Sequence, residues 1–227
     1  MALIRETRVD GLFAGRVALL ENDSRSSAIA KSAVSGRLAL TPTGLVGDEQ
    51  ADRRVHGDEG KALHLLPAEH LVRLQSAFPE ARHLYPGGLG ENISTAGQTE
   101  CDVCIGDIFR IGTAWIQVSQ PRRPCWKIDH RTGCDGMAAY IFLHGIAGWY
   151  FRVLEAGTIA VDDVMTHSER PVGAPTLMAF WNLTRNERYP AEALEQLSTA
   201  PGLEPDWRTR LQERAAYLRR NPIAVAE

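Results

Sequence analysis

The sequence has few cysteines, little excess charge and no long apolar run, and each shortage excludes a class of protein. Its 227 residues carry a net charge of −3, so the broad basic surface typical of nucleic-acid-binding proteins is not expected. The most apolar stretch, residues 137–151, is interrupted by His144 and two glycines and falls short of the ~20 apolar residues that a membrane span needs. Residues 1–8 lack the apolar segment of a secretory signal. We therefore expect a cytoplasmic protein that does not bind a membrane.

Only four cysteines occur, and thiols are expected to stay reduced in the cytoplasm. Cys101 and Cys104 have the C-x-x-C spacing of a zinc site or a redox pair, but no second pair accompanies them. We interpret these two as structural residues. Cys134 lacks the charged neighbours that surround Cys125. Cys125 is therefore the cysteine whose surroundings favour chemistry.

The first two-thirds of the chain have the pattern of a β-rich core. Short apolar or alternating runs bounded by turn residues predict strands at 17–20, 37–40, 108–111 and 115–120. Many short strands with frequent glycine favour an antiparallel barrel or sandwich. Two helices are expected to interrupt the strands, at residues 68–78 and 137–154.

The pattern changes after Pro171, where three segments have helical spacing. Helices are expected at 175–183, 190–197 and 205–220, and each has a proline at or near its first turn, where the missing N–H costs least. The sequence therefore predicts a mainly β core over residues 1–170 and a small all-α, three-helix domain over residues 171–227.

The segment with the clearest chemical character is the run from Gln120 to Cys125. A predicted strand continues into a loop that Pro121 and Pro124 stiffen, because proline fixes its own φ and restricts the preceding residue. Arg123 lies two residues before Cys125, and a nearby positive charge favours the thiolate that attacks electrophiles or binds soft metals. The alternative is a surface loop with solvated arginines and an inert thiol.

Two further segments are rich in glycine and polar residues. Residues 47–61 contain His56, a candidate acid, base or ligand near neutral pH, and Lys61, a point charge suited to phosphate. A solvated loop is the alternative interpretation. Residues 87–97 resemble an anion-binding glycine loop but lack the spacing of a known phosphate-binding motif. His64 lies in an apolar run and is expected to be a core histidine.

Together these segments resemble one family. The order and spacing are similar to those of MOSC-domain proteins, named after the C-terminal domain of molybdenum-cofactor sulfurases, and to the YiiM-like subgroup with a C-terminal three-helix domain. The matching motifs are GLVGD (44–48), AD (51–52), VHG (55–57), GEN (90–92) and QPRxPC (120–125). The family commonly has a second glycine after His-Gly, where this chain has Asp58, so either the Asp58 carboxylate points to solvent or this loop binds the cofactor differently.

The resemblance implies a β-barrel-like core that binds the molybdenum cofactor, a molybdopterin. It also implies that Cys125 is the functional cysteine and the metal ligand, and that His56 supplies a proton. The cofactor-binding residues implied are Arg122, Arg123, Lys61, Asn92, Glu91, Gln120, Asp48 and Lys31. Family-level descriptions also include pyridoxal phosphate binding.

The function implied by the resemblance is reduction of N-hydroxylated purines such as 6-hydroxylaminopurine. Such an enzyme needs an electron-donor redox protein, because no electron-donor motif is apparent, and a homodimer is an open alternative to a monomer. Two other functions stay open. Cys125 could carry persulfide sulfur to other molybdoenzymes, or the C-terminal helices could form a non-enzymatic binding module. Nucleic acid is not the expected partner, because residues 170–220 contain eight arginines against six acidic residues.

Overall fold

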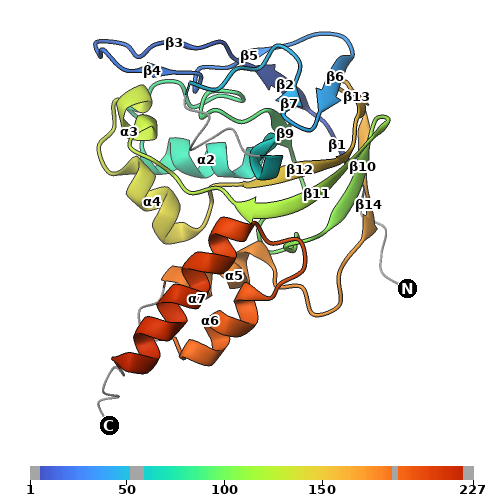
Figure 1. Ribbon diagram of the computed structural model, residues 1–227. Coiled ribbons are helices and arrows are strands. Elements are labelled where there is room, and N and C mark those ends of the chain that lie inside the picture. The colour runs from blue at the N-terminus through green and yellow to red at the C-terminus, as the bar shows by residue number, and fades with distance from the viewer. Residues whose placement is uncertain (1–5, 52–58, 186–188, 222–227) are drawn as a thin grey trace.

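The computed structural model describes residues 6–51, 59–185 and 189–221. Within them, a nine-stranded sheet bends around a buried interior (Figure 1). All its neighbouring strands pair antiparallel except β8 and β9, which are parallel. In order across the sheet, the strands are β1 (Glu6–Arg8), β14 (Val164–Glu169), β10 (Ile108–Ile111), β11 (Ala114–Pro121), β12 (Trp149–Glu155), β8 (Leu63–Pro67), β9 (Ile93–Thr95), β2 (Gly11–Ala14) and β5 (Ser32–Ala33).

Two small sheets flank the large one. The first contains β13 (Gly157–Ile159), β6 (Leu38–Thr41) and β7 (Gly44–Leu45), and the second is the hairpin of β3 (Ala18–Leu19) and β4 (Ser26–Ser27). The predicted strands at 17–20, 37–40, 108–111 and 115–120 correspond to β3, β6, β10 and β11. A turn at Gly112, whose φ is +55°, joins β10 to β11, as the turn residues predicted.

The helices form two groups in Figure 1. The first group comprises α2 (Ala68–Ala77), α3 (Lys127–Thr132) and α4 (Met137–His144), and a short 3₁₀ turn, η1 (Glu59–Lys61), precedes β8. The second group comprises α5 (Leu177–Arg185), α6 (Ala191–Ser198) and α7 (Pro205–Arg220). These three helices agree with the prediction, so the expected fold class, a β-rich core with a three-helix unit, is confirmed. No helix in the described parts of the chain is long and apolar enough to cross a membrane.

The predicted helix over 137–154 was wrong in its second half. Helix α4 ends at His144 with Gly145 as its C-cap, and Gly145 and Gly148 both have positive φ values, +64° and +71°, which end helices readily. Residues Trp149–Glu155 then form β12, paired with β8 and β11. An apolar segment this long contains two elements, because the glycines interrupt it and the residues after them are aromatic and β-branched.

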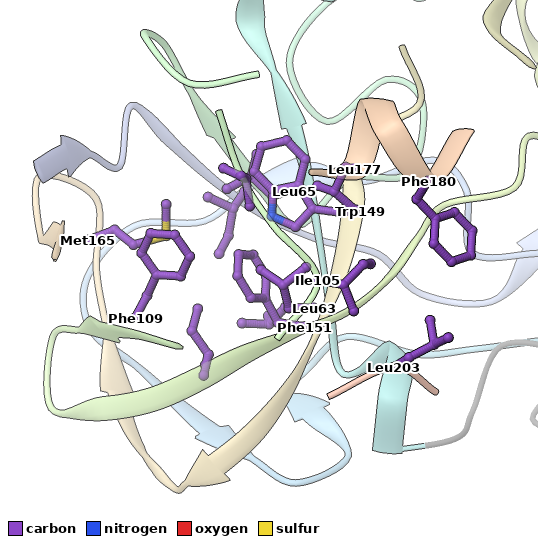
Figure 2. Packing of buried hydrophobic residues seen from close by; sticks show 14 of the residues in the cluster. Leu63, Leu65, Ile105, Phe109, Trp149, Phe151, Met165, Leu177, Phe180 and Leu203 are labelled. Carbon is purple, nitrogen blue, oxygen red and sulfur yellow. The ribbon is translucent and has the colours of Figure 1, made fainter. Parts of the chain in front are cut away.

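A single hydrophobic cluster fills the interior of the sheet and extends into the C-terminal helices (Figure 2). Phe109 and Phe151 meet edge to face with ring centroids 6.0 Å apart, and Trp149 lies 6.4 Å from Phe151. Leu177 and Phe180 of α5 belong to the same buried cluster. The division into residues 1–170 and 171–227 stays a prediction, and the apolar core is continuous across it.

Candidate functional site

Cys125 lies in a short connection between β11 and α3. The backbone leaves the sheet at Pro121, and the Arg122 amide donates to the Gly148 carbonyl at 3.0 Å, which ties the connection to the start of β12. The Ile128 amide then donates to the Cys125 carbonyl at 3.0 Å as α3 begins. Cys125 is partly exposed and forms no disulfide. The loop that was predicted to be stiff therefore follows the end of β11 and leaves the Cys125 thiol partly exposed.

Two hollows meet at Cys125, one of about 100 Å³ and one of about 450 Å³. Both are lined by Lys61, Arg123, Cys125, Lys127 and Tyr150. The smaller hollow extends into the sheet and is lined further by a set of mostly polar residues, among them Lys31, Asp48, His64, Asn92 and Arg122. The larger hollow extends toward the C-terminal helix α7.

The two adjacent arginines have different surroundings. Arg122 is 6% exposed, and its Nη2 donates to the Leu89 carbonyl at 2.9 Å, whereas its buried Nη1 has no hydrogen-bond partner among the described residues. The Arg123 guanidinium lies 5.8 Å from the ring centroid of Trp207 in α7. Partial burial, followed by the nearby charge of Arg210, lowers the pKa of Arg123. Arg122 therefore lines only the smaller hollow, whereas Arg123 lines both hollows.

Glu91 lies beneath the glycine-rich loop and does not line either hollow. Its carboxylate is fully buried and accepts the Gly87 and Leu89 amides at 2.6 and 3.1 Å. Burial raises the pKa of Glu91, and these amide contacts and the Arg122 charge oppose the shift. Leu89 in turn presents its carbonyl to Arg122, so the structure supports a positioning role for Glu91, and its predicted contact with a cofactor stays a prediction.

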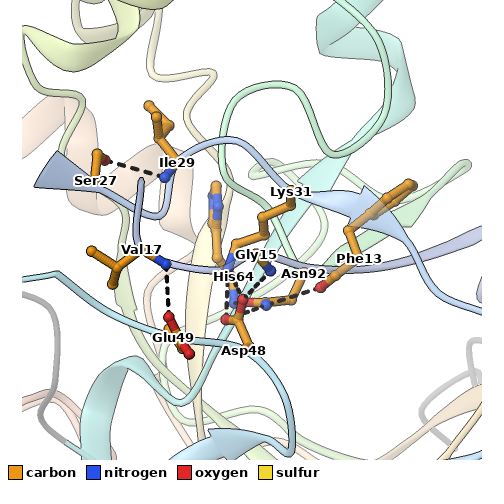
Figure 3. Close-up of polar contacts among 10 residues, drawn as sticks. All are labelled: Phe13, Gly15, Val17, Ser27, Ile29, Lys31, Asp48, Glu49, His64 and Asn92. Carbon is orange, nitrogen blue, oxygen red and sulfur yellow. Dashed lines mark hydrogen bonds and ion pairs between the residues drawn. The ribbon is translucent and has the colours of Figure 1, made fainter. Parts of the chain in front are cut away.

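Lys31, Asp48 and Asn92 form one polar network at the wall of the smaller hollow (Figure 3). The Lys31 ammonium pairs with both oxygens of Asp48, and the Gly15 amide and Asn92 Nδ2 donate to the same carboxylate at 2.7 and 2.8 Å. Burial lowers the pKa of Lys31, and its contacts with Asp48 oppose that shift. The network joins four segments of the chain and holds the wall in place.

Asn92 has no N–H left for a ligand. Its Nδ2 donates to the Phe13 carbonyl at 3.2 Å as well as to Asp48, and its Oδ1 accepts the His64 amide at 3.1 Å. Asn92 was predicted to bind the cofactor, but its amide donors are already used within the protein. That prediction stays untested, and the geometry favours a supporting role.

His64 is buried as predicted, yet it also lines the smaller hollow. Its Nε2 lies 3.0 Å from the Ala147 carbonyl, and its buried Nδ1 has no hydrogen-bond partner in the described part of the chain. Burial, followed by the positive charge of Arg122, lowers the pKa of His64 well below 6.5. The neutral ring donates through Nε2 because a carbonyl only accepts, which leaves Nδ1 as an acceptor.

A neutral buried His64 makes stability depend on pH. The unfolded chain binds more protons than the folded chain once the pH falls below the unfolded pKa of about 6.5. We therefore expect this residue to lower the free energy of unfolding by up to ~1.4 kcal/mol for each pH unit below that value. Urea denaturation of the wild type and of His64→Gln at pH 7.5 and pH 5 should show the smaller loss for the variant. Equal losses in the two proteins would contradict a neutral His64.

Of the remaining predicted residues, Gln120 and Lys61 line the hollows. Gln120 lines the larger hollow, and its Nε2 donates to the Gly60 carbonyl at 3.3 Å. Lys61 lines both hollows, as expected for a residue that binds a ligand. His56 lies outside the described residues, as does Asp58, so the proton-donor prediction stays a prediction.

The sequence did not single out several residues that line the site. Lys127 and Tyr150 line both hollows, and Trp126, Trp207 and Arg210 line the larger one. Lys127 and Trp126 follow Cys125 directly, so their position near it could have been predicted. Trp207 and Arg210 reach the site only through the packing of α7 on the core.

Cys101 and Cys104 lie away from the junction and line neither hollow. Cys101 is exposed and Cys104 is buried. Within the described ranges, no group of three or more His, Cys, Asp or Glu side chains is arranged to hold a metal ion.

Comparison with known proteins identifies the family. The MOSC domain model matches residues 52–166. The chain is 37% identical over 193 residues to the protein YiiM of Escherichia coli strain K12, covering 85% of this chain and 86% of that protein. It is 35% identical over 148 residues to a protein named reductase from Gibberella moniliformis, covering 64% of this chain and 26% of that longer protein.

A solved structure has the same fold over most of the chain. The crystal structure of YiiM from Geobacillus stearothermophilus superposes with a TM-score of 0.78 at 32% identity, covering 92% of this chain and 99% of that one. The chain therefore belongs to the MOSC-domain family, whose members are associated with the molybdenum cofactor, and to its YiiM-like subgroup.

Proposed function

We propose that this protein holds the molybdenum cofactor at the junction of the two hollows, with the pterin toward the smaller hollow and Cys125 at the metal, and reduces N-hydroxylated purines of the 6-hydroxylaminopurine type. The observation that carries the proposal is the position of Cys125, where a narrow hollow with a buried, unpartnered arginine nitrogen meets a wider one. A thiolate is a soft ligand suited to such a metal. The relative named reductase supports a reductive reaction.

The residues of the smaller hollow fit an anionic, hydrogen-bonding pterin. Arg122 Nη1 needs an acceptor, because an unsatisfied buried donor is costly, and a phosphate or carbonyl oxygen provides one. His64 Nδ1 accepts, so it suits an N–H of the pterin ring. Lys61 and Lys127 add positive charge at the entrance. Lys31 and Asp48 neutralise each other and hold the wall.

The reaction consumes two electrons and two protons: the N–O bond breaks, the hydroxylamine becomes an amine, and the oxygen leaves as water. The bound cofactor supplies the two-electron chemistry. The chain's own residues position the cofactor through Arg122 and keep Cys125 accessible from the wider hollow. An external redox protein is the proposed source of electrons, and His56 is the proposed source of a proton.

The test uses protein purified from cells that synthesise the cofactor. We expect molybdenum by elemental analysis, a pterin by fluorescence, and conversion of 6-hydroxylaminopurine to adenine when a chemically reduced viologen dye replaces the electron donor. Protein that retains molybdenum and pterin but forms no adenine contradicts the reductase function. Protein that holds neither contradicts the cofactor site.

Arg122→Met is expected to lower the molybdenum retained by the purified protein at least about tenfold, because charge-assisted contacts to an anion are lost. Arg131→Met is the matched control. Arg131 donates to the Gly88 carbonyl at 2.6 Å, next to the Leu89 carbonyl that Arg122 uses, but it lines neither hollow. Equal metal content in the two variants, with circular dichroism showing both folded, would refute a cofactor contact at Arg122.

A further inference from the structure

The larger hollow opens between the Cys125 loop and the first turns of α7. Its volume of about 450 Å³ lies in the range of about 300–1,000 Å³ usual for small-molecule sites. Its lining combines cationic and aromatic side chains from both sides. They are Lys61, Gln120, Arg123, Pro124, Cys125, Trp126, Lys127, Tyr150, Asp206, Trp207 and Arg210.

The start of α7 is tied to the sheet, so its side chains have a defined place beside Cys125. The Glu204 amide donates to the Ser119 carbonyl of β11 at 3.1 Å. Arg152 of β12 pairs with the Glu204 carboxylate at 2.7 Å and donates to the Gly202 carbonyl at 2.7 Å. These contacts join the C-terminal helix to both strands that lead to the site (Figure 1).

Two tryptophans line the hollow, Trp126 from the Cys125 loop and Trp207 from α7. Trp207 packs edge to face against Phe180 and Trp181, with centroids 5.0 and 6.4 Å apart, which holds its ring. Trp126, in the Cys125 loop, is 42% exposed, and Arg25 covers it at 3.8 Å from the ring centroid. Indole faces stack on planar heteroaromatic rings.

Positively charged side chains outnumber negatively charged ones in the lining of the larger hollow. The side chains of Arg123, Arg210 and Lys127 form no ion pair or hydrogen bond with any residue that the structure describes, and Asp206 is the one acidic residue in the lining. Guanidinium groups bind phosphate through paired N–H donors. Unpaired cations beside aromatic faces suit a ligand with a planar ring and an anionic group.

We propose that the larger hollow binds its aromatic substrate as a 5′-nucleotide, with Arg123 and Arg210 on the phosphate and the tryptophans flanking the ring. This inference rests on the proposed function for the identity of the reacting group. Under it, the C-terminal helix determines substrate specificity, because Arg210 distinguishes a nucleotide from a nucleoside or free base.

The test compares three probes on cofactor-free protein by isothermal titration calorimetry: AMP, adenosine and inorganic phosphate. We expect AMP to bind at least about tenfold more tightly than adenosine or phosphate alone, as a charge-assisted contact to phosphate predicts. Arg210→Gln should lower the AMP affinity about tenfold and leave adenosine binding unchanged. Arg220→Gln is the matched control, since it removes the same charge from the same helix ~15 Å farther along and lines neither hollow.

Equal affinities for AMP and adenosine, or an Arg210→Gln variant that binds AMP like the wild type, would overturn the inference. Inorganic phosphate that binds as tightly as AMP would show that the tryptophans contribute nothing to the affinity, and would contradict stacking of the ring on them. On molybdenum-loaded protein, the N-hydroxylated 5′-monophosphate should have a KM at least about tenfold below that of the free base. Reduction of both at equal KM refutes this inference alone, whereas selective AMP binding without any reduction refutes the proposed reaction alone.

Discussion

Replacing Cys125 with alanine is expected to abolish reduction of N-hydroxylated purines while leaving the fold intact. The thiol is partly exposed between the two hollows and is not among the buried hydrophobic core residues, so core packing does not depend on it. Loss of groups that merely support a metal ligand typically costs about 10–100-fold in activity or metal affinity. Loss of the ligand itself should lower kcat/KM at least about 100-fold. Steady-state kinetics normalised to molybdenum content measure this.

Cys101→Ala is the matched control for the Cys125 variant. Cys101 is an exposed thiol that lines neither hollow, so activity and metal content should match those of the wild type. A Cys125→Ala protein with full metal loading and full activity would refute the metal-ligand role. Mass spectrometry of the wild type separates the alternative function: a one-sulfur adduct on Cys125 without bound pterin would identify a sulfur carrier in place of a reductase.

The elements with clear local signals could be predicted. The strand Ile108–Ile111 and the first half of Ala114–Pro121 alternate in burial, the two strands flank a glycine turn, and both appear as expected. The C-terminal helices also appear where proline and helical spacing placed them. For these elements, the periodicity and the turn or capping residues that predict them lie within the element or next to it. The segment from Met137 to Glu155 has no such periodicity, because its uniform apolar character suits a buried helix and a buried strand equally.

Only the part of the candidate site whose residues are close together in the sequence could be predicted. Arg122, Arg123 and Cys125 share one loop, and the structure brings them to the junction of the two hollows. The surroundings of Asn92 and Glu91 depend on contacts with distant segments, such as the 2.8 Å contact from Asn92 to Asp48. Long-range hydrogen bonds decide whether a polar side chain faces a ligand or supports the backbone, and spacing does not contain that information.

Asp48→Asn is expected to destabilise the protein by about 3–5 kcal/mol, a large share of the ~5–15 kcal/mol that stabilises a typical domain. The side chains of Lys31 and Asp48 are each 7% exposed, so the variant leaves the ammonium buried without its counter-charge. It also replaces one carboxylate oxygen with an N–H₂ group, so the donor of either Gly15 or Asn92 loses its acceptor. Urea denaturation at pH 7.5 measures the change in the free energy of unfolding.

A double-mutant cycle separates loss of the pair from loss of one charge. Removing both charges with Lys31→Met and Asp48→Asn should recover at least half of the single-variant loss, because no uncompensated charge then stays buried. Asp162→Asn is the exposed control: Asp162 pairs with Arg8, the two side chains are 64% and 66% exposed, and asparagine tolerates its φ of +72°. That variant should cost below ~1 kcal/mol. Additive losses at Lys31 and Asp48 would mean that the two side chains stabilise the wall of the smaller hollow independently, and the network would then not hold the wall as a unit.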